Sequence, residues 1–119
     1  MFNNLRQPRR VVITGFGCVT PIGIGRKKFW ESLKNGVSGV KKIESFDASE
    51  FAVQIAAEIQ DFDWEAELSV KDRRNVARTV PLALRAGREA LEDAGMQTND
   101  LSLAERQNFG VILGTGGGG

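Results

Sequence analysis

The sequence predicts a single α/β domain. Short apolar runs rich in β-branched residues alternate with segments of helical periodicity, in the order strand, helix, strand, helix, strand. That order favours helices layered on a sheet, with right-handed crossover connections between parallel strands. The 119 residues are 41% apolar with mixed charge, as in globular proteins, and show neither an internal repeat nor a linker.

The first strand and the first helix are expected near the N-terminus. Residues 9–17, "RRVVITGFG", form a short apolar run that ends in glycines, which is typical of a strand buried on both faces of a parallel sheet. In residues 26–36, "RKKFWESLKNG", helical spacing places Phe29, Trp30 and Leu33 on one face. Gly36 stands where a C-terminal helix cap belongs.

A second strand and a long helix follow. The strand is expected in "AVQIAAEI", where alternate residues point to one side. These residues are Val53, Ile55, Ala57 and Ile59.

The long helix is expected over about 72–94, and Gly95 supplies its stop. A three-and-four spacing predicts one buried stripe, which consists of Val76, Val80, Ala83, Gly87, Ala90 and Ala94. Pro81 interrupts the pattern, so we expect a kink or a new helix start near Thr79. The last run, "FGVILG" (109–114), is predicted to be another buried strand, and it leads into "GTGGGG".

Charge and composition exclude several classes of protein. Sixteen basic and fifteen acidic residues give a net charge of +1, so no overall field indicates a nucleic-acid or membrane partner. No apolar stretch approaches a membrane span, and the N-terminus lacks the apolar segment of a signal peptide, so we expect a cytoplasmic protein. The charge is unevenly spread, because eight carboxylates and no cation lie between Ile43 and Val70, and "KDRRNVAR" then supplies four cations.

The absence of histidine excludes Ser–His and Cys–His nucleophilic pairs and histidine-ligated zinc within this chain. The single cysteine, Cys18, has no cation close by in sequence that would lower its pKa, so we interpret it as a small packed side chain.

The glycines in "VVITGFGCVTPIG" suggest a phosphate-binding turn, but the match to a dinucleotide fingerprint is poor. Thr20 stands where the third glycine belongs, and no acid follows at the expected distance. The terminal "GTGGGG" offers backbone N–H groups to an anion, or room for a ligand or another segment close to the backbone.

Seven motifs in this order and spacing resemble the N-terminal section of type II elongating β-ketoacyl-[acyl-carrier-protein] synthases. They are "RRVVITGFGCVTPIGIG", "FWESLKNGVSGV", "FDASEF", "AAEIQDFD", "KDRR", "ALEDAGM" and "FGVILGTGGGG". The resemblance implies a thiolase-like fold with α-β-α-β-α layers, of which residues 1–119 form part of the N-terminal half. It also implies an acyltransferase that carries out decarboxylative Claisen condensation with malonyl-acyl-carrier protein, in fatty-acid or polyketide elongation.

The same resemblance implies an acyl-carrier-protein partner, a homodimer and no cofactor. The family's catalytic cysteine and two histidines lie beyond the motifs present here, so we expect the 119 residues alone to be inactive. Gly117 matches a position that lines the acyl pocket. Lys71 and Arg74 match positions that meet the carrier protein.

One alternative stays open from the sequence. A non-catalytic partner that resembles a chain-length factor shares this fold and these motifs but lacks the catalytic cysteine. Because the distinguishing residues belong to later parts of the family's domain, residues 1–119 are compatible with either function.

Overall fold

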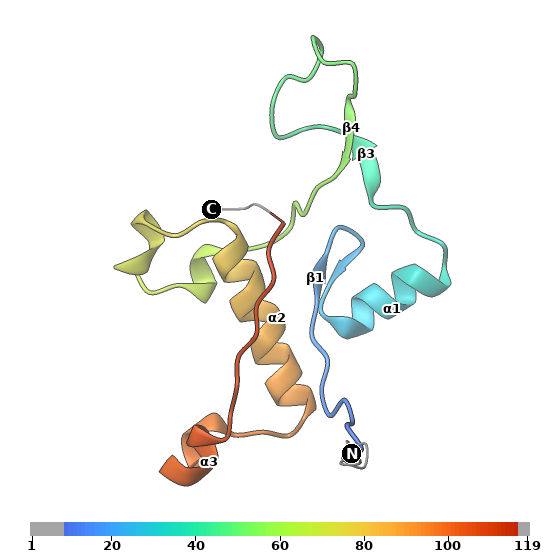
Figure 1. Ribbon diagram of the computed structural model, residues 1–119. Helices are drawn as coiled ribbons and strands as arrows, with labels where there is room; N and C mark the ends of the chain where they lie inside the picture. The colour runs from blue at the N-terminus through green and yellow to red at the C-terminus, as the bar shows by residue number, and fades with distance from the viewer. Residues whose placement is uncertain (1–8, 117–119) are drawn as a thin grey trace, which may run out of the picture.

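The structure is a computed structural model that describes residues 9–116 (Figure 1). Its helices are α1 (Arg26–Lys34), α2 (Thr79–Asp93) and α3 (Leu103–Gln107). Its strands are β1 (Val19–Thr20), β2 (Gly23–Ile24), β3 (Val40–Lys42) and β4 (Ile55–Ala57). Single 3₁₀ turns occur at η1 (Glu65–Glu67), η2 (Asp72–Arg74) and η3 (Thr98–Asp100).

The strands form two separate antiparallel hairpins. In the first, β1 pairs with β2 across a tight turn, and the N–H of Gly25 donates to the carbonyl of Cys18 at 2.9 Å. In the second, β3 pairs with β4, with Lys41 opposite Ala56. The loop between β3 and β4 extends away from the other elements at the top of Figure 1.

The helix ends follow from local sequence. α2 begins at Thr79, so Pro81 lies in its first turn, where the missing N–H would have no intrahelical partner in any case. The expected new helix start near Thr79 is therefore confirmed, but the helix predicted over about 72–94 is wrong for residues 72–78, which form η2 and a non-helical segment. Beyond α1 and α2, Gly36 and Gly95 adopt φ values of 65° and 66°, which an L side chain rarely tolerates, and both helix stops are confirmed.

Each of these glycines closes the same capping arrangement. The N–H of Val37 donates to Ser32 at 3.0 Å, and the N–H of Met96 donates to Leu91 at 2.9 Å. These bonds from the second residue past the cap back into the last turn define a Schellman motif, which satisfies carbonyls that the helix leaves open.

Two strand predictions are wrong for this structure. Residues 11–13 and 111–113 belong to no hydrogen-bonded strand, and Ile13 and Ile112 are 91% and 97% exposed. A strand buried on both faces needs neighbouring strands and covering layers, and within 9–116 neither segment has them. The parallel sheet with crossover connections is accordingly absent from the described part of the chain.

The predicted buried faces also need correction. Of the predicted stripe, Ala90 in α2, Ala94 at its C-cap and Val76 before its start are half-buried as expected, but Val80, Ala83 and Gly87 are exposed. The covered face lies around Ala86 and Ala90 instead, because residues 15–17 run along it. Elsewhere, Trp30 and Leu33 of α1, Ile55 of β4 and Val53 just before β4 are each at least half exposed, because the described residues cover only part of each side chain.

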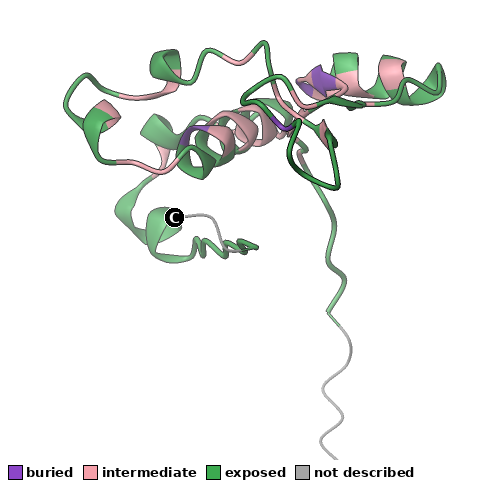
Figure 2. Ribbon diagram, turned by 90° about the horizontal axis from the view of Figure 1, so that it is seen from above, coloured by how far each residue is buried: buried purple, intermediate pink, exposed green. Residues whose placement is uncertain are grey.

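Very little of the molecule forms a core. Ala48, at 4% exposure, and Pro81 have the most deeply buried side chains, and Figure 2 shows buried segments as short isolated stretches. The radius of gyration is 19.1 Å, against about 13.5 Å for a compact domain of this length. Among the described residues, the tertiary structure rests on the two hairpins, on the packing of α1 against β2, and on the contacts of α2 with η1 and β1.

Candidate functional site

The two cations expected to meet a carrier protein lie around η2. Lys71 immediately precedes this turn, Arg74 ends it, and both side chains are exposed. The turn is closed by the Ser69 hydroxyl, which donates to Asp72 at 2.5 Å, and by the Asp72 N–H, which donates to the Ser69 carbonyl at 2.9 Å. The two cations are thus presented on a short, hydrogen-bonded turn just before α2.

Acidic residues neutralise other cations nearby but not these two. Arg73 pairs with Glu65 at 3.0 Å. Glu67 forms ion pairs with Arg88 at 2.7 Å and with Arg85 at 3.7 Å, and these pairs connect η1 to α2. Within residues 9–116, neither Lys71 nor Arg74 takes part in an ion pair. Their charge is therefore available to an external acidic surface.

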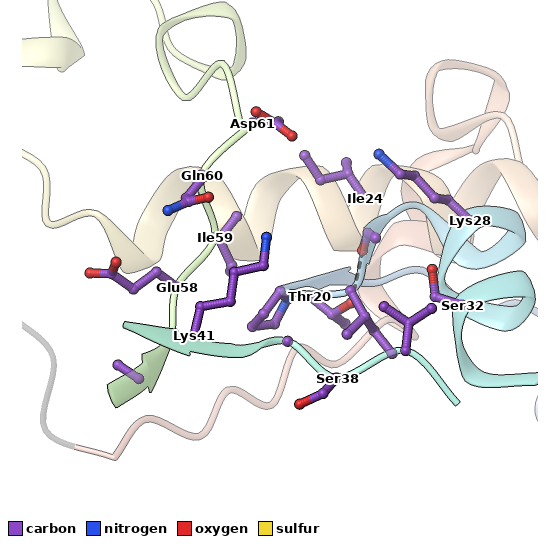
Figure 3. A pocket seen from close by; sticks show the side chains of 16 residues that line it. Thr20, Ile24, Lys28, Ser32, Ser38, Lys41, Glu58, Ile59, Gln60 and Asp61 are labelled. Atoms are coloured by element: carbon purple, nitrogen blue, oxygen red, sulfur yellow. Dashed lines mark hydrogen bonds between the residues drawn. The ribbon is translucent and has the colours of Figure 1, made fainter. Parts of the chain in front are cut away.

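At least two hollows lie in the described region. One, of about 520 Å³, adjoins the basic segment and is lined by Gln60, Phe62, Trp64, Arg73, Val76 and Arg78. The other, of about 250 Å³, lies between the β1–β2 hairpin, α1 and residues 56–61 (Figure 3). Sequence reasoning identified neither hollow, because each gathers residues from segments that show no common pattern.

The smaller hollow has a mixed electrostatic lining. Lys28 and Lys41 contribute cations, and Glu58 and Asp61 contribute carboxylates (Figure 3). The N–H of Glu44 and then the hydroxyl of Ser45 hold the pKa of Glu58 below its usual range. Glu58 is thus ionised and held by its own chain, and the hollow contains no cysteine or other strong nucleophile among its lining residues.

The glycine motif is occupied by protein carboxylates. The N–H of Cys18 donates to one oxygen of Glu89 at 3.1 Å, and the N–H of Arg26 donates to the other at 2.9 Å. One helical turn further along α2, Asp93 accepts from the N–H of Phe16 at 3.1 Å and pairs with the Arg26 guanidinium. N–H groups that a phosphate would need are therefore already taken, which supports the rejection of dinucleotide binding.

Sequence reasoning missed Glu89 and Asp93. Their spacing of four on a helix was a usable signal, because it places both carboxylates on one face. What the spacing did not reveal was the identity of the segment facing them.

Cys18 is not activated. Its thiol is half-buried, and burial, followed by the negative charge of Glu89, raises the pKa of Cys18 above its usual value. A nucleophilic cysteine needs the opposite shift, because the thiolate is the reactive form. This supports its interpretation as a packed side chain.

The predicted pocket residue Gly117 lies outside the described residues. In the portion that the structure describes, no three side chains gather as a metal-binding group. No helix there has the length and apolar character needed to cross a membrane.

Comparisons with known proteins identify the family. The family model "Beta-ketoacyl synthase, N-terminal domain" matches residues 8–119. The chain is 43% identical to 3-oxoacyl-[acyl-carrier-protein] synthase 2 of Coxiella burnetii over 113 residues, which cover 95% of this chain and 27% of that protein. It is 38% identical to the protein of the same name from Vibrio cholerae over 111 residues, which are 93% of this chain and 26% of that protein.

A solved structure agrees with the sequence relatives. The ishigamide ketosynthase/chain length factor superposes with a TM-score of 0.66 at 35% identity, over 78% of this chain and 23% of that one. The predicted α/β fold class, that of the N-terminal part of the thiolase-like fold, is confirmed at this level. The chain spans about a quarter of the length of the curated relatives it matches, and it belongs to the β-ketoacyl synthase family through the N-terminal domain of that family.

Proposed function

We propose that the chain is the N-terminal section of an enzyme that condenses acyl groups with malonyl-acyl-carrier protein during fatty-acid or polyketide elongation. The observation that carries the proposal is the family match over residues 8–119, together with relatives named 3-oxoacyl-[acyl-carrier-protein] synthase 2. The 119 residues contain no histidine, and their one cysteine has a raised pKa. In this proposal the catalytic groups come from the remainder of the enzyme, and residues 1–119 alone have no condensing activity. The full-length enzyme acts in the cytoplasm as a homodimer without a cofactor.

The first role of this section is to meet the acidic carrier protein through Lys71 and Arg74. Their exposure and their lack of ion pairs among the described residues support this role. Reversing both to Glu in the full-length enzyme should raise KM for carrier-linked substrate, weaken its salt dependence and leave kcat unchanged. The rise should not exceed about 30-fold, because an exposed ion pair contributes about 0.2–1 kcal/mol.

A matched control reverses Lys27 and Lys42, which are also exposed but lie on other elements. The control variant should retain the KM of the wild type at every salt concentration. If the Lys71/Arg74 variant also keeps an unchanged KM across the salt series, these residues form an ordinary solvated surface and the docking role is wrong.

The second role is to form part of the acyl pocket at Gly117. Gly117→Ile should then lower kcat/KM more for long acyl substrates than for short ones, since each methylene denied burial forfeits about 0.8 kcal/mol, or roughly fourfold. Gly117→Ala is the control, because it adds a Cβ without reaching far into a channel. An equal loss at every chain length, in both variants, would instead assign the glycine to backbone conformation.

The similarity to the ishigamide ketosynthase/chain length factor favours one alternative, a non-catalytic partner subunit. The two functions differ in covalent chemistry. A synthase incubated with carrier protein that bears an acyl thioester becomes acylated itself, and intact mass spectrometry detects the added mass. A chain-length-factor-like subunit gains no acyl mass and needs an active partner for turnover.

A further inference from the structure

The first turn of α1 lacks a cap of its own. Its N-cap residue is Gly25, with φ 84°, which has no side chain to accept a hydrogen bond. The next three residues, Arg26, Lys27 and Lys28, are all cations, and the first turn contains no acid. A helix N-terminus carries partial positive charge and unsatisfied N–H groups, so three local cations are unfavourable there. An anion from elsewhere would therefore stabilise this helix start.

Glu89 supplies that anion from α2. One carboxylate oxygen accepts from the N–H of Arg26 at 2.9 Å, and the other accepts from the N–H of Cys18 at 3.1 Å, across 63 and 71 residues of sequence. A Cβ placed on Gly25 would lie 3.0 Å from the first of these oxygens. The carboxylate thus bridges the start of α1 and the non-strand segment that leads into β1.

Two glycines make this bridge possible. A Cβ on Gly17 would lie 2.1 Å from the carbonyl oxygen of Ala86, and one on Gly15 would lie 2.0 Å from that of Ala90. Only a segment without side chains at these positions can approach α2 closely enough for its N–H groups to reach the carboxylates. The glycine motif and the acids on α2 are therefore two parts of one arrangement.

We infer that Glu89 is a built-in anion, which takes the place that a bound phosphate occupies at comparable glycine-rich helix starts. It is a positioning residue: it fixes the β1–β2 hairpin relative to α1 and so sets one wall of the smaller hollow. When Glu89 is cut back to Ala, the vacated position binds a small external carboxylate such as formate.

The direct test is amide hydrogen exchange at Cys18 and Arg26 in the full-length protein. Glu89→Ala should speed exchange at both amides by about 10- to 100-fold, because a hydrogen bond to a charged group is lost at each. Adding sodium formate should restore much of the protection, and sodium chloride at equal ionic strength should not. Glu92→Ala is the matched control, since Glu92 is exposed on the same helix and should leave both amides unchanged.

A second variant keeps the test decisive if E89A does not fold. Glu89→Gln preserves side-chain size but offers one acceptor and one donor, so one of the two amides should lose protection while the interior of α2 retains it. Formate should have no effect on E89Q, because the amide fills the site. Unchanged exchange at both amides in either variant overturns the inference, as does a failure of formate to restore protection in folded E89A.

Discussion

Gly17 gives the sharpest test of how the N-terminal segment is attached to α2. In the Gly17→Ala variant the new Cβ would lie 2.1 Å from the carbonyl oxygen of Ala86 and 2.7 Å from the N–H nitrogen of Ala90. Real Cβ atoms essentially never approach closer than 3.0 Å, and both neighbours are backbone atoms that cannot rotate away. The segment must therefore move off the helix by about 1 Å or more, which is the difference between the 2.1 Å contact and the 3.0 Å minimum.

Such a shift breaks the hydrogen bonds from Phe16 to Asp93 and from Cys18 to Glu89. A hydrogen bond to a charged group contributes about 1.5–3 kcal/mol, so the loss of both should lower the free energy of unfolding by about 3–6 kcal/mol. That is a large share of the roughly 5–15 kcal/mol that stabilises a typical domain.

The assay is urea unfolding of the full-length protein, followed by circular dichroism, with the slope against urea checked for constancy. Gly87→Ala is the matched control, because a Cβ there meets open space on the same helix. It should stabilise the protein by about 0.5–1 kcal/mol through helix propensity. A Gly17→Ala variant within about 1 kcal/mol of wild type, on the scale of these helix effects, would refute the close approach.

Two further predictions concern ionisable groups. Because burial and then the charge of Glu89 raise the pKa of Cys18, its thiol should react with iodoacetamide at neutral pH more slowly in the folded protein than in urea, and rapid labelling of the folded protein would contradict this. Cys18→Ala should retain condensing activity in the full-length enzyme, and loss of activity in a variant that still folds would show that Cys18 has a catalytic role. At α3, the Ser102 side chain and then its backbone N–H hold the pKa of Glu105 below its usual value. A lowered folded-state pKa means that this capping box stabilises the protein above the usual pKa of Glu and stops doing so as pH falls through the folded value. Ser102→Ala should raise the pKa of Glu105, as followed by NMR titration of its carboxyl carbon, and an unchanged titration would show that the capping box has no such effect.

Several features were predictable from sequence because their causes are local. Pro81 excludes itself from a helix interior, which sets the start of α2 at Thr79. Gly36 and Gly95 permit the positive φ that ends a helix, and both occur where the periodicity stops. The family was also identifiable, because its motifs lie in register along the whole chain.

The candidate sites were predictable to different degrees. Lys71 and Arg74 were identified from their positions in a motif. The structure adds that both are exposed, whereas Arg73, which lies between them in sequence, is paired with Glu65. Glu89 was not identified, because nothing in its own neighbourhood indicates that residues 63 and 71 positions away donate to it.

The sequence by itself determined the helix start near Thr79, the ends of α1 and α2, that the chain mixes helices with strands, and which family it belongs to, whereas α3 was not predicted. Only the tertiary structure decided which faces are covered. The apolar runs at 11–13 and 111–113 have strand-like composition, but a strand exists only when another backbone supplies its hydrogen bonds, and the described residues supply none. The covered face of α2 likewise depends on where Gly15 and Gly17 lie in space. Periodicity reports the side chains available for burial, whereas burial itself requires a partner from a distant part of the chain.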